Sequence, residues 1–271
     1  MSVTSRPAPD ESTDAPAESR GALAESRDAL AEPRAAAAES PGAPAAEVRS
    51  MFARIAPTYD VLNRVLSARR DVGWRRAAVA ALDPDARRIL DLCAGTGDLS
   101  LAIAAQRPDA HVVAGDFCVE MLRRGVAKGF GRAVAPAACD ALHLPFADAT
   151  FDAITVAFGV RNFESLDAGL REMRRIVRPG GQLIVLEFFR SASGRLDRPF
   201  QFYFRHVLPR LGRLVSHDAA AYSYLPASVG RFVTRAEFAQ HLARTGWTLE
   251  RARDLTFGIA SLISARNFQE Q

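Results

Sequence analysis

The chain has 271 residues, of which 48% are hydrophobic and 24% are charged, as in an ordinary soluble globular protein. No apolar run reaches the roughly 18 residues that a membrane-spanning helix needs, and the polar N-terminal residues lack the apolar core of a secretory signal peptide. The three cysteines, Cys93, Cys118 and Cys139, form neither a CxxC pair nor a metal-ligand spacing. We therefore expect a cytoplasmic protein with reduced thiols and no bound metal.

Charge is unevenly distributed along the chain. Residues 1–47 hold four arginines and nine acidic residues, a net charge of −5, whereas the remainder holds 31 basic and 22 acidic residues, a net charge of +9. A basic globule suits an anionic partner such as a membrane surface or a nucleic acid. Because Lys128 is the only lysine in the sequence, the excess can also reflect a general use of arginine.

The first 46 residues form a low-complexity segment of Ala, Glu, Pro, Ser and Arg. A loose seven-residue repeat runs through it, but its apolar positions hold little beyond alanine, which is too little for a coiled-coil seam. Such a segment cannot bury enough apolar surface to offset the entropy lost on ordering. We predict a disordered tail at 1–46 and a single folded domain at 47–271.

Helical spacing of apolar residues across 48–82, interrupted at Pro57, predicts two or three helices that precede the sheet and are candidates to cover its open edge. Short apolar runs then alternate with helical periods. Strands are expected at Arg88–Cys93, His111–Asp116, Ala133–Cys139, Phe151–Phe158 and Gln182–Phe188, with helices at Asp98–Gln106, Val119–Lys128 and Leu166–Val177. This alternation predicts βαβ units and a parallel sheet.

The C-terminal part begins with an insertion at about 199–226. A helix at Arg235–Thr245 follows, and then two strands at Thr248–Leu255 and Ile259–Ala265, close enough to form an antiparallel hairpin. We therefore predict an α/β fold with a doubly wound, seven-stranded, mostly parallel sheet.

The turn after the first predicted strand carries the strongest chemical signal. The strand ends near Asp91, and Gly95 and Gly97 let the backbone turn tightly into the next helix. A dinucleotide site usually adds a third glycine, so that the helix N-terminus can approach a pyrophosphate. Here that glycine is missing, and the flanking Asp91 and Asp98 would repel a pyrophosphate. The turn suits a ligand with a sulfonium and an ammonium group.

Two further acidic positions follow the next strands. Asp116 ends the second strand, 21 positions after Gly95, where a carboxylate can accept both hydroxyls of a ribose. Asp140 and Ala141 follow the third strand, where they can meet the exocyclic amine of an adenine. The alternatives are a solvated aspartate at the end of a strand for Asp116 and a simple turn for Asp140-Ala141.

Several short motifs lie along the predicted folded part of the chain. They are Asp91-Leu-Cys-Ala-Gly-Thr-Gly-Asp98, Leu144-Pro-Phe146, Phe158-Gly-Val-Arg-Asn162, Arg178-Pro-Gly-Gly181, Val185-Leu-Glu-Phe188, His206-Val-Leu-Pro-Arg210 and Tyr222-Ser-Tyr-Leu225. Together with Tyr59-Asp60, Asn63, Ser67, Trp74 and Asp218, they resemble the ubiquinone/menaquinone biosynthesis C-methyltransferase family from about Val48 onward. Most methyltransferases of this kind share the glycine turn, whereas the motifs at 159–162 and 206–210 are much more specific to this family.

The resemblance implies the Rossmann-like fold of class I methyltransferases, with S-adenosylmethionine as the methyl donor. It also implies C-methylation of a polyprenyl quinol, namely demethylmenaquinol and, in some members, 2-methoxy-6-polyprenyl-1,4-benzoquinol. By position, Thr96, Asp116 and Asp140-Ala141 would contact the donor. Family members often have a serine where this chain has Ala157, so here we expect a backbone contact in place of a side-chain hydrogen bond.

Arg161 and Asn162 are the candidate catalytic residues, just beyond the fourth predicted strand. A hydroquinone carbon becomes nucleophilic when an adjacent hydroxyl loses its proton, and a guanidinium beside the donor can stabilise the developing phenolate. Asn162 can orient Arg161 or the ring oxygen. Similar members have been considered to use an arginine-polarised water as base, so no lone side chain is assigned. A surface salt bridge is the alternative role for Arg161.

The candidate substrate-binding residues are Tyr59, His143, Tyr222 and Tyr224. Tyr59 and Asp60 lie in the N-terminal helices and can close over the donor as a lid. The other two tyrosines can line a quinol pocket, although packing is the alternative for each aromatic residue. His206 and His217 are, like His143, candidate bases whose alternative is a structural hydrogen-bond donor.

The insertion is densely apolar at 198–215, with Arg205, Arg210 and Arg213 interspersed. This composition is typical of an element at a membrane interface, and also of a helix packed on the sheet or of a dimer surface. Besides the quinol, we therefore expect peripheral contact with the inner membrane surface and leave a homodimer open. Nucleic acid is not expected, because no proline-rich catalytic loop such as NPPY occurs.

Other functions stay open at this point. One is a methyltransferase for another lipophilic phenol or sterol. Another is a non-catalytic quinone-binding component of a biosynthetic complex, which predicts a damaged glycine turn, whereas Gly95, Gly97 and Asp116 are all intact. A nicotinamide oxidoreductase is disfavoured because the third glycine is missing.

Overall fold

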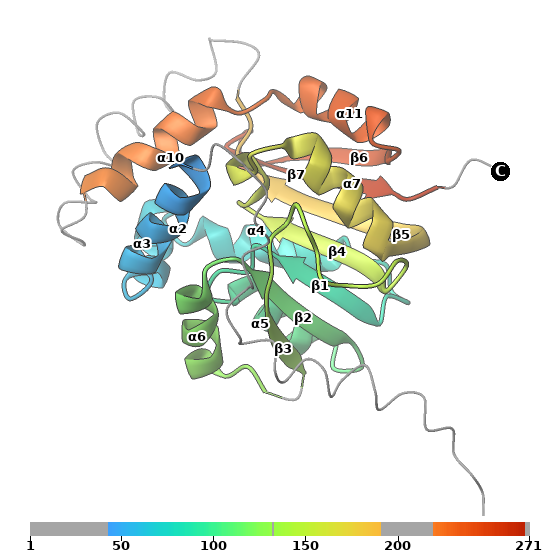
Figure 1. Cartoon of the computed structure of the whole chain (residues 1–271), viewed down its shortest axis with the longest axis horizontal. Coiled ribbons are helices and arrows are strands. Elements are labelled where there is room, and N and C mark those ends of the chain that lie inside the picture. Colours follow the sequence, from blue (N-terminus) through green and yellow to red (C-terminus); the bar gives the residue numbers. More distant parts are fainter. Residues whose placement is uncertain (1–42, 132, 191–218, 269–271) are drawn as a thin grey trace, which may run out of the picture.

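A single sheet organises the chain, as a computed structural model shows for residues 43–131, 133–190 and 219–268 (Figure 1). Its strand order is β3-β2-β1-β4-β5-β7-β6. The strands are β1 (Arg88–Leu92), β2 (His111–Asp116), β3 (Val134–Ala138), β4 (Phe151–Ala157), β5 (Val177–Glu187), β6 (Thr248–Leu255) and β7 (Ala260–Arg266). Strands β1 to β5 pair in parallel, and β7 runs antiparallel to both β5 and β6. The predicted fold class is confirmed.

The chain order reverses in the middle of the sheet. From β1 the chain proceeds outward to β2 and β3, and then returns to place β4 on the other side of β1. Ligands of open α/β sheets bind beyond the carboxyl ends of the strands at such a switch point. A candidate site is therefore expected where β1, β2 and β4 end.

Helices cover both faces of the sheet. They are α2 (Ala43–Ile55), α3 (Tyr59–Leu66), α4 (Arg70–Ala80), α5 (Asp98–Gln106), α6 (Val119–Lys128), α7 (Leu166–Ile176), α10 (Ala219–Arg231) and α11 (Arg235–Arg244), with a short 3-10 helix, η3 (Val160–Asn162). The apolar residues of α4 and α5 belong to one core cluster, together with Leu122 of α6, and those of α7 and α11 belong to a second, while Met121 of α6 lies in a third and smaller cluster.

Alternating side chains explain the two clusters. Successive residues of a strand point to opposite faces. Ile89 lies in the cluster below α4 and α5, whereas Leu90 lies in the cluster below α7, and both are fully buried. Leu183 and Ile184 divide in the same way on β5. The central strands are therefore apolar on both sides, as buried parallel strands must be.

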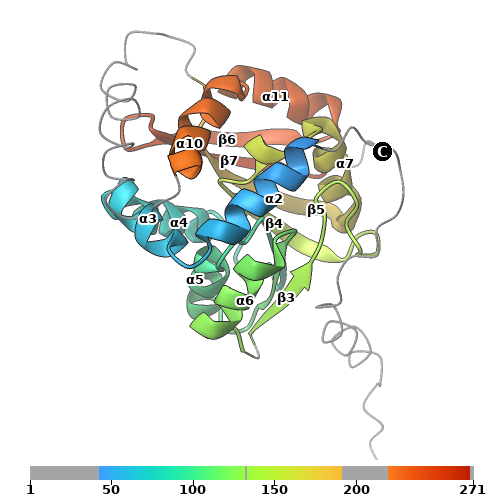
Figure 2. The same cartoon turned by 60° about the vertical axis from the view of Figure 1, so that its left-hand side comes forward.

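The N-terminal helices do not cover the edge of the sheet, so that expectation was wrong. Helix α4 packs on β5 and β7, which are interior strands, while α2 contacts α6 and α10. Figure 2 shows α2 lying across the front of the molecule, beside α10 and above α6. Ile55 and Ala56 are buried there against Cys118 and Met121, so these apolar faces are already used at the end of β2.

Two predicted boundaries also needed correction. Strand β5 begins at Val177, not at Gln182, because Val177 already pairs with Phe151 before the register shifts around the Pro179-Gly180-Gly181 turn. Helix α10 runs through Pro226, which was predicted to end the insertion. Of the predicted tail at 1–46, residues 1–42 lie outside the described residues, as does the amphipathic stretch at 198–215, whereas residues 43–46 already belong to α2. No helix of the described part is long and apolar enough to cross a membrane.

Candidate active site

The turn between β1 and α5 is built from left-handed backbone conformations. Gly95 and Gly97 have φ of 57° and 78°, and Cys93 has φ of 58°. A Cβ built on Gly97 would lie 2.2 Å from the ring of Phe130, so no larger residue fits without displacing that ring. Strained non-glycine residues such as Cys93 tend to occur at functional sites, because the surrounding structure must hold them in place.

Asp116 ties this turn to the end of β2. Its Oδ2 accepts the Gly95 N–H and its Oδ1 accepts the Cys118 N–H, each at 2.8 Å. Burial leaves Asp116 only 6% exposed and raises the pKa of its carboxyl to about 6. A carboxylate oxygen can accept more than one hydrogen bond, so both oxygens keep capacity for a hydroxyl donor. The donor set therefore fits the ribose of a nucleoside.

Asp91 lies deeper than expected for a ligand contact. It is 1% exposed, with Oδ2 accepting from Ser100 at 2.5 Å and Oδ1 accepting from Thr155 at 2.8 Å. Burial raises the pKa of Asp91 to about 6, although both hydroxyls oppose the shift. Asp91 joins β1, β4 and α5 beneath the turn. Its predicted contact with the donor stays a prediction.

A polar network fastens α3 to the turn. The Thr96 hydroxyl is buried and donates to Asp60 at 2.5 Å. The Lys128 ammonium lies 2.8 Å from Asp60 and 3.2 Å from Thr96, and also pairs with Asp98. On the other side of Asp98, Arg64 approaches at 3.4 Å. Helices α3, α5 and α6 thus meet at Thr96, which the sequence predicted as a donor contact.

Tyr59 lies directly over the glycine turn. A Cβ on Gly95 would lie 3.7 Å from Cε1 of this ring. Burial raises the pKa of the Tyr59 hydroxyl, while Arg75 and Arg161 oppose the shift and Asp116 adds to it. The predicted lid residue therefore lies among the candidate donor and catalytic groups.

The end of β4 closely approaches the end of β1. Phe158, which follows Ala157, has φ of 59°, and a Cβ on Gly159 would lie 2.4 Å from that of Cys93. Only glycine at position 159 permits this approach. Phe158 stacks on Phe188 with ring centroids 4.6 Å apart, which joins the ends of β4 and β5. Ala157 ends β4 just before this approach, and its donor contact stays a prediction.

Arg161 is held in a nearly buried ion pair. Its Nη1 donates to Glu187 at 2.7 Å and to the Phe158 carbonyl at 2.6 Å, and its Cζ lies 5.9 Å from the centroid of the Phe188 ring. The side chains of Arg161 and Glu187 are 7% and 0% exposed. Burial raises the pKa of Glu187, and Arg161 opposes that rise. The Nε of Arg161 is buried with no hydrogen-bond partner among the described residues.

Asn162 and Tyr224 meet although they lie far apart in sequence. The Tyr224 hydroxyl donates to Asn162 Oδ1 at 2.7 Å. The ring of Phe52 contacts both Tyr59 and Tyr224 edge-on, with centroids 6.0 and 6.4 Å apart. An aromatic row therefore leads from the glycine turn to the candidate catalytic residues, and it joins α2, α3 and α10.

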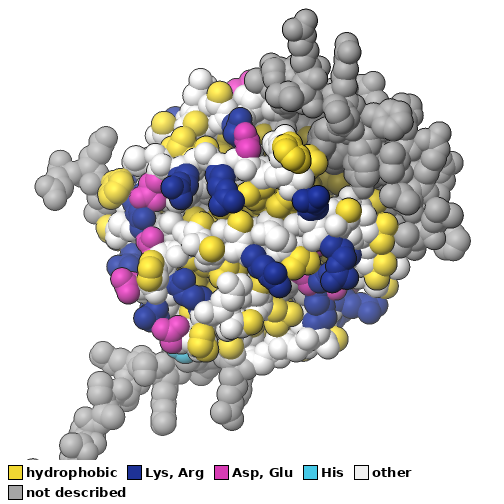
Figure 3. All heavy atoms as spheres, turned by 180° about the vertical axis from the view of Figure 1, so that it is seen from behind, with side chains coloured by type: hydrophobic (Ala, Val, Ile, Leu, Met, Phe, Trp, Pro, Cys, Tyr) yellow, Lys and Arg dark blue, Asp and Glu magenta, His cyan; other side chains and the backbone are white. Residues whose placement is uncertain are grey.

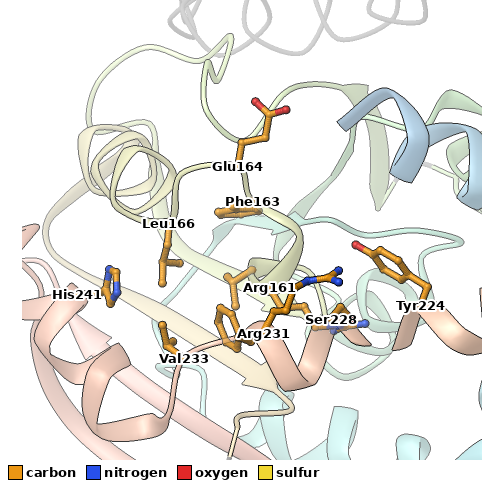
Figure 4. A pocket seen from close by; sticks show the side chains of 11 residues that line it. Arg161, Phe163, Glu164, Leu166, Tyr224, Ser228, Arg231, Val233 and His241 are labelled. Carbon is orange, nitrogen blue, oxygen red and sulfur yellow. The ribbon is translucent and has the colours of Figure 1, made fainter. Parts of the chain in front are cut away.

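A cavity of about 240 Å³ opens beside these residues, between η3, α7, α10 and α11 (Figure 4). Its lining consists of Val160, Arg161, Phe163, Glu164, Leu166, Tyr224, Ser228, Arg231, Phe232, Val233 and His241. Arg161 and Tyr224 thus face a space that is large enough for a small aromatic ring.

The structure does not bring every predicted residue to this cavity. The side chain of His143 is 85% exposed, its Nδ1 lies 3.4 Å from Asp140, and it does not line the cavity. Asp140 also accepts the N–H of Leu142, while Ala141 is half-buried beside the end of β3. Positions 206 and 217 and the side chain of Tyr222 lie outside the described part.

Three residues of the site escaped sequence reasoning: Glu187, Lys128 and His241. Glu187 had a readable signal, because it is the only charged residue in the apolar run at 183–189 and it ends a strand. Lys128 was noticed only as the single lysine. Nothing in the local sequence distinguishes His241, because its importance comes from a cavity formed by distant segments.

Comparison with known proteins decides the family. The sequence model of the ubiE/COQ5 methyltransferase family matches residues 42–266. The chain belongs to this family. It is therefore an S-adenosylmethionine-dependent methyltransferase, and the predicted enzyme class and cofactor are confirmed.

Relatives of the family match most of the chain. A demethylmenaquinone methyltransferase of Deinococcus radiodurans is 48% identical over 218 residues, which covers 79% of this chain and 90% of the relative. One from Thermus thermophilus is 45% identical, covering 78% and 97%. The ubiquinone/menaquinone biosynthesis C-methyltransferase UbiE of Syntrophotalea carbinolica is 46% identical, covering 82% and 94%. The alternative functions find no support in these relatives.

Solved structures with low sequence identity share the fold. The 1,6-didemethyltoxoflavin-N1-methyltransferase of Burkholderia thailandensis, solved with S-adenosylhomocysteine, has a TM-score of 0.59 at 21% identity and covers 86% of this chain and 93% of its own. The [4+2]-cyclase SpnF has a TM-score of 0.62 at 15% identity, covering 83% and 96%. Since a cyclase shares it, the architecture alone does not define the reaction.

Proposed function

We propose that this family member methylates a ring carbon of demethylmenaquinol, with Arg161 stabilising the charge that develops on the neighbouring ring oxygen. The observation that carries the proposal is the fixed guanidinium of Arg161, two residues after Gly159, which packs against Cys93 of the glycine turn. Arg161 is oriented by Glu187, is almost removed from solvent and lines a cavity of ring size. Relatives that are 45% and 48% identical carry the name of this reaction.

The protein's own residues would supply position and charge. When bound, S-adenosylmethionine supplies an activated methyl group on its positive sulfur. Asp116 and Thr96 would hold the donor at the end of β2 and at the turn, and Tyr59 would cover it. Holding two reactants close together and aligned can lower an activation barrier by roughly 7–11 kcal/mol. Asn162, held by Tyr224, would keep the ring oxygen or Arg161 in line.

The developing phenolate is the group that needs stabilisation. Loss of the hydroxyl proton places negative charge on the oxygen next to the reacting carbon. A guanidinium fixed in a nearly buried site stabilises such charge better than one in water, because the dielectric is lower and no reorganisation is needed. Glu187 keeps Arg161 oriented while leaving its remaining donors for the substrate.

A benzoquinol is a second candidate acceptor. The relative from Syntrophotalea carbinolica is named for both ubiquinone and menaquinone biosynthesis. Both rings are 1,4-quinols with a polyprenyl chain, so the same charge stabilisation would serve 2-methoxy-6-polyprenyl-1,4-benzoquinol.

Transfer of a labelled methyl group tests the reaction. The full chain would be incubated anaerobically with labelled donor and demethylmenaquinol, 2-methoxy-6-polyprenyl-1,4-benzoquinol or no acceptor. We expect label in the naphthoquinol product, and label in the benzoquinol product as well if both rings are accepted. Tight donor binding without transfer to either quinol would refute the proposed substrate.

Peripheral membrane contact is a further part of the proposal. A polyprenyl quinol resides in the bilayer, and the chain after residue 47 has a net charge of +9. Figure 3 shows arginine and lysine side chains spread over the face opposite to that in Figure 1, with fewer acidic side chains among them. Such a surface is attracted to anionic lipid headgroups.

Sedimentation with lipid vesicles tests this contact. We expect the protein to sediment with phosphatidylglycerol vesicles at low salt and to be released by high salt, because screening weakens surface attraction. Equal binding to phosphatidylcholine, or none to either lipid, would contradict a charge-driven contact. Sedimentation velocity without lipid would show whether the chain forms the homodimer that the sequence left open.

A further inference from the structure

The cavity that Arg161 lines has a second polar group on its opposite wall. Figure 4 shows His241 on one side of the cavity and Arg161 and Tyr224 on the other. His241 lies in the last turn of α11, and its side chain is 18% exposed. The apolar part of the lining consists of Val160, Phe163, Leu166, Phe232 and Val233, and Glu164, Ser228 and Arg231 also line the cavity. Apolar walls with a few convergent polar groups are typical of small-molecule sites.

Two neighbours fix the orientation of the His241 ring. Its Nδ1 lies 2.5 Å from Oδ1 of Asp167, whose Oδ2 accepts from Nε of Arg244 at 2.7 Å. Nη2 of Arg244 lies 2.5 Å from Nδ1 and 3.1 Å from Nε2 of the same ring. Because the two ring nitrogens point in different directions, a group this close to both packs against the ring and lies along neither lone pair.

This arrangement leaves one nitrogen of the ring for a ligand. With Nδ1–H donating to Asp167, the tautomer is set and Nε2 carries the lone pair, which Nη2 of Arg244 approaches at 3.1 Å. Nε2 can then accept a hydrogen bond from a hydroxyl inside the cavity.

We infer that this cavity takes the ring of the acceptor, with His241 accepting a hydrogen bond from the hydroxyl on the side of the ring away from the reacting carbon. The inference rests on the proposed function, because it requires a 1,4-dihydroxy ring. Such a ring carries hydroxyls on opposite sides of a flat apolar body. The cavity has Arg161 and His241 on opposite walls, with five apolar residues in its lining besides Glu164, Ser228 and Arg231. Arg161 therefore serves the reacting side, and His241 selects a quinol over a ring with one hydroxyl.

A pair of ligands that differ by one hydroxyl tests this assignment. One is a short-chain 2-prenyl-1,4-naphthoquinol, and the other is the analogue that lacks only the hydroxyl distant from the reacting carbon. Their Kd values would be measured anaerobically by calorimetry, with S-adenosylhomocysteine present, for the wild-type chain, His241→Leu and His241→Gln. His111→Leu is the matched control, since His111 is exposed at the amino end of β2.

In the wild-type chain we expect the quinol to bind about ten-fold more tightly than the analogue, because a lost hydrogen bond leaves a polar group unpaired. His241→Leu should reduce that ratio to below about two-fold by weakening quinol binding alone. His241→Gln should keep part of the ratio because its amide oxygen can also accept. His111→Leu should behave as wild type.

Equal weakening of both ligands in His241→Leu, or an unchanged ratio, would overturn the inference. Thermal unfolding of each variant would show whether the chain still folds, and His241→Gln keeps the test valid if His241→Leu does not. Methyl transfer in the same samples separates the two proposals. If the ratio of the two Kd values changes in His241→Leu but no methyl group is transferred by the wild-type chain, only the proposed reaction is refuted. If methyl transfer occurs and the ratio is the same in both chains, only the role of His241 is refuted.

Discussion

The ion pair between Arg161 and Glu187 carries the chemical proposal at the scale of single residues. Removing two charges from water costs more than most ion pairs return, so such a pair contributes little net stability. Its clearer effect is to fix the guanidinium, because one nitrogen donates both to Glu187 and to a backbone carbonyl. The ion pair therefore serves mainly to orient the Arg161 guanidinium and adds little to the stability of the fold.

Conservative variants of this pair separate orientation from charge. Arg161→Lys keeps the charge but loses the planar fork, and we expect kcat to fall about 10²–10³-fold, as when a charge-stabilising donor is lost, with the donor Kd unchanged. Glu187→Gln keeps the shape of the side chain and should reduce kcat by about ten-fold for the same reason. Steady-state kinetics with calorimetry of donor binding would measure both.

The matched control is Arg235→Lys, because Arg235 pairs with Asp254 at 2.7 Å on the surface, with both side chains 46% exposed. This variant should keep wild-type kinetics, since exposed pairs contribute little. Unchanged kcat in Arg161→Lys would remove Arg161 from the chemistry. A donor Kd weakened in step with kcat would place Arg161 in donor binding instead.

Asp91 predicts a pH dependence of stability. Burial raises the pKa of its carboxyl from 3.8 to about 6, so the folded state binds more protons than the unfolded state between these values. Stability should therefore fall as pH rises from about 4 to about 6, with an upper limit near 3 kcal/mol for this residue. Asp116 adds a shift of the same sign.

The variant Asp91→Asn isolates this effect. Ser100 and Thr155 can turn their hydroxyls to serve an amide, so the hydrogen bonds can be kept while the buried charge is removed. Urea unfolding across this pH range should show a shallower fall and higher stability at pH 7 than wild type. An unchanged pH profile would contradict the burial argument. A large rise in the donor Kd would instead support the predicted donor contact of Asp91.

Lys128 acts at the scale of whole elements. Its ammonium at the end of α6 lies between Asp60 on α3 and Asp98 on α5. Without the Lys128 ammonium, the carboxylates of Asp60 and Asp98 would repel each other more strongly. Helix α3 would then be held less firmly against the glycine turn. Since Tyr59 on α3 lies over Gly95, the cover of the donor site depends on this contact.

Lys128→Met should therefore raise the donor Kd by about ten-fold, and Lys128→Arg should restore much of the affinity because it keeps a cation at this place. Because the sequence has a single lysine, acetylation of its ε-amine can be followed by peptide mass. S-adenosylhomocysteine should slow that acetylation if α3 closes over the donor. Wild-type affinity in Lys128→Met together with unprotected acetylation would contradict this role.

The sequence predicted the bounds of helices and strands well where characteristic residues mark their ends. The bounds of α5, α6, β2 and β6 agree with the structure, because glycine, proline and aspartate mark their ends and their periods are regular. The start of β5 was wrong because a Pro-Gly-Gly turn resembles a terminator, whereas here the strand continues through it. The place of the N-terminal helices was also wrong, because apolar periodicity gives a buried face but not its partner.

The candidate site was predictable on one side only. Gly95, Gly97, Thr96 and Asp116 lie together because a strand, a turn and a helix are contiguous in sequence, and the next strand is the neighbour of the first. Glu187, Tyr224 and His241 reach the same region from distant segments, so only the tertiary structure brings them together. His143 shows the converse, since it follows a strand end but points to solvent.

At the scale of the whole molecule, the two halves of the sheet contribute different parts of the candidate site. The half with β1 to β3 holds the turn and Asp116, where we propose that the donor binds, while the half with β4 to β7 holds Arg161, Glu187 and the cavity beside α10 and α11. The division of the chain into a tail and one domain stays a prediction, although helix α2 already begins at Ala43.

If Arg161 holds the developing charge on the ring oxygen, the methyl group must arrive at carbon. The most direct test is the position of a ¹³C methyl group in the product formed from demethylmenaquinol, read by NMR for wild type and Arg161→Lys. We predict that wild type places the label on the ring carbon and none on oxygen, because the guanidinium shields the phenolate, and that the product nearly disappears in Arg161→Lys. A methyl ether, or undiminished ring methylation in Arg161→Lys, would refute this role of Arg161.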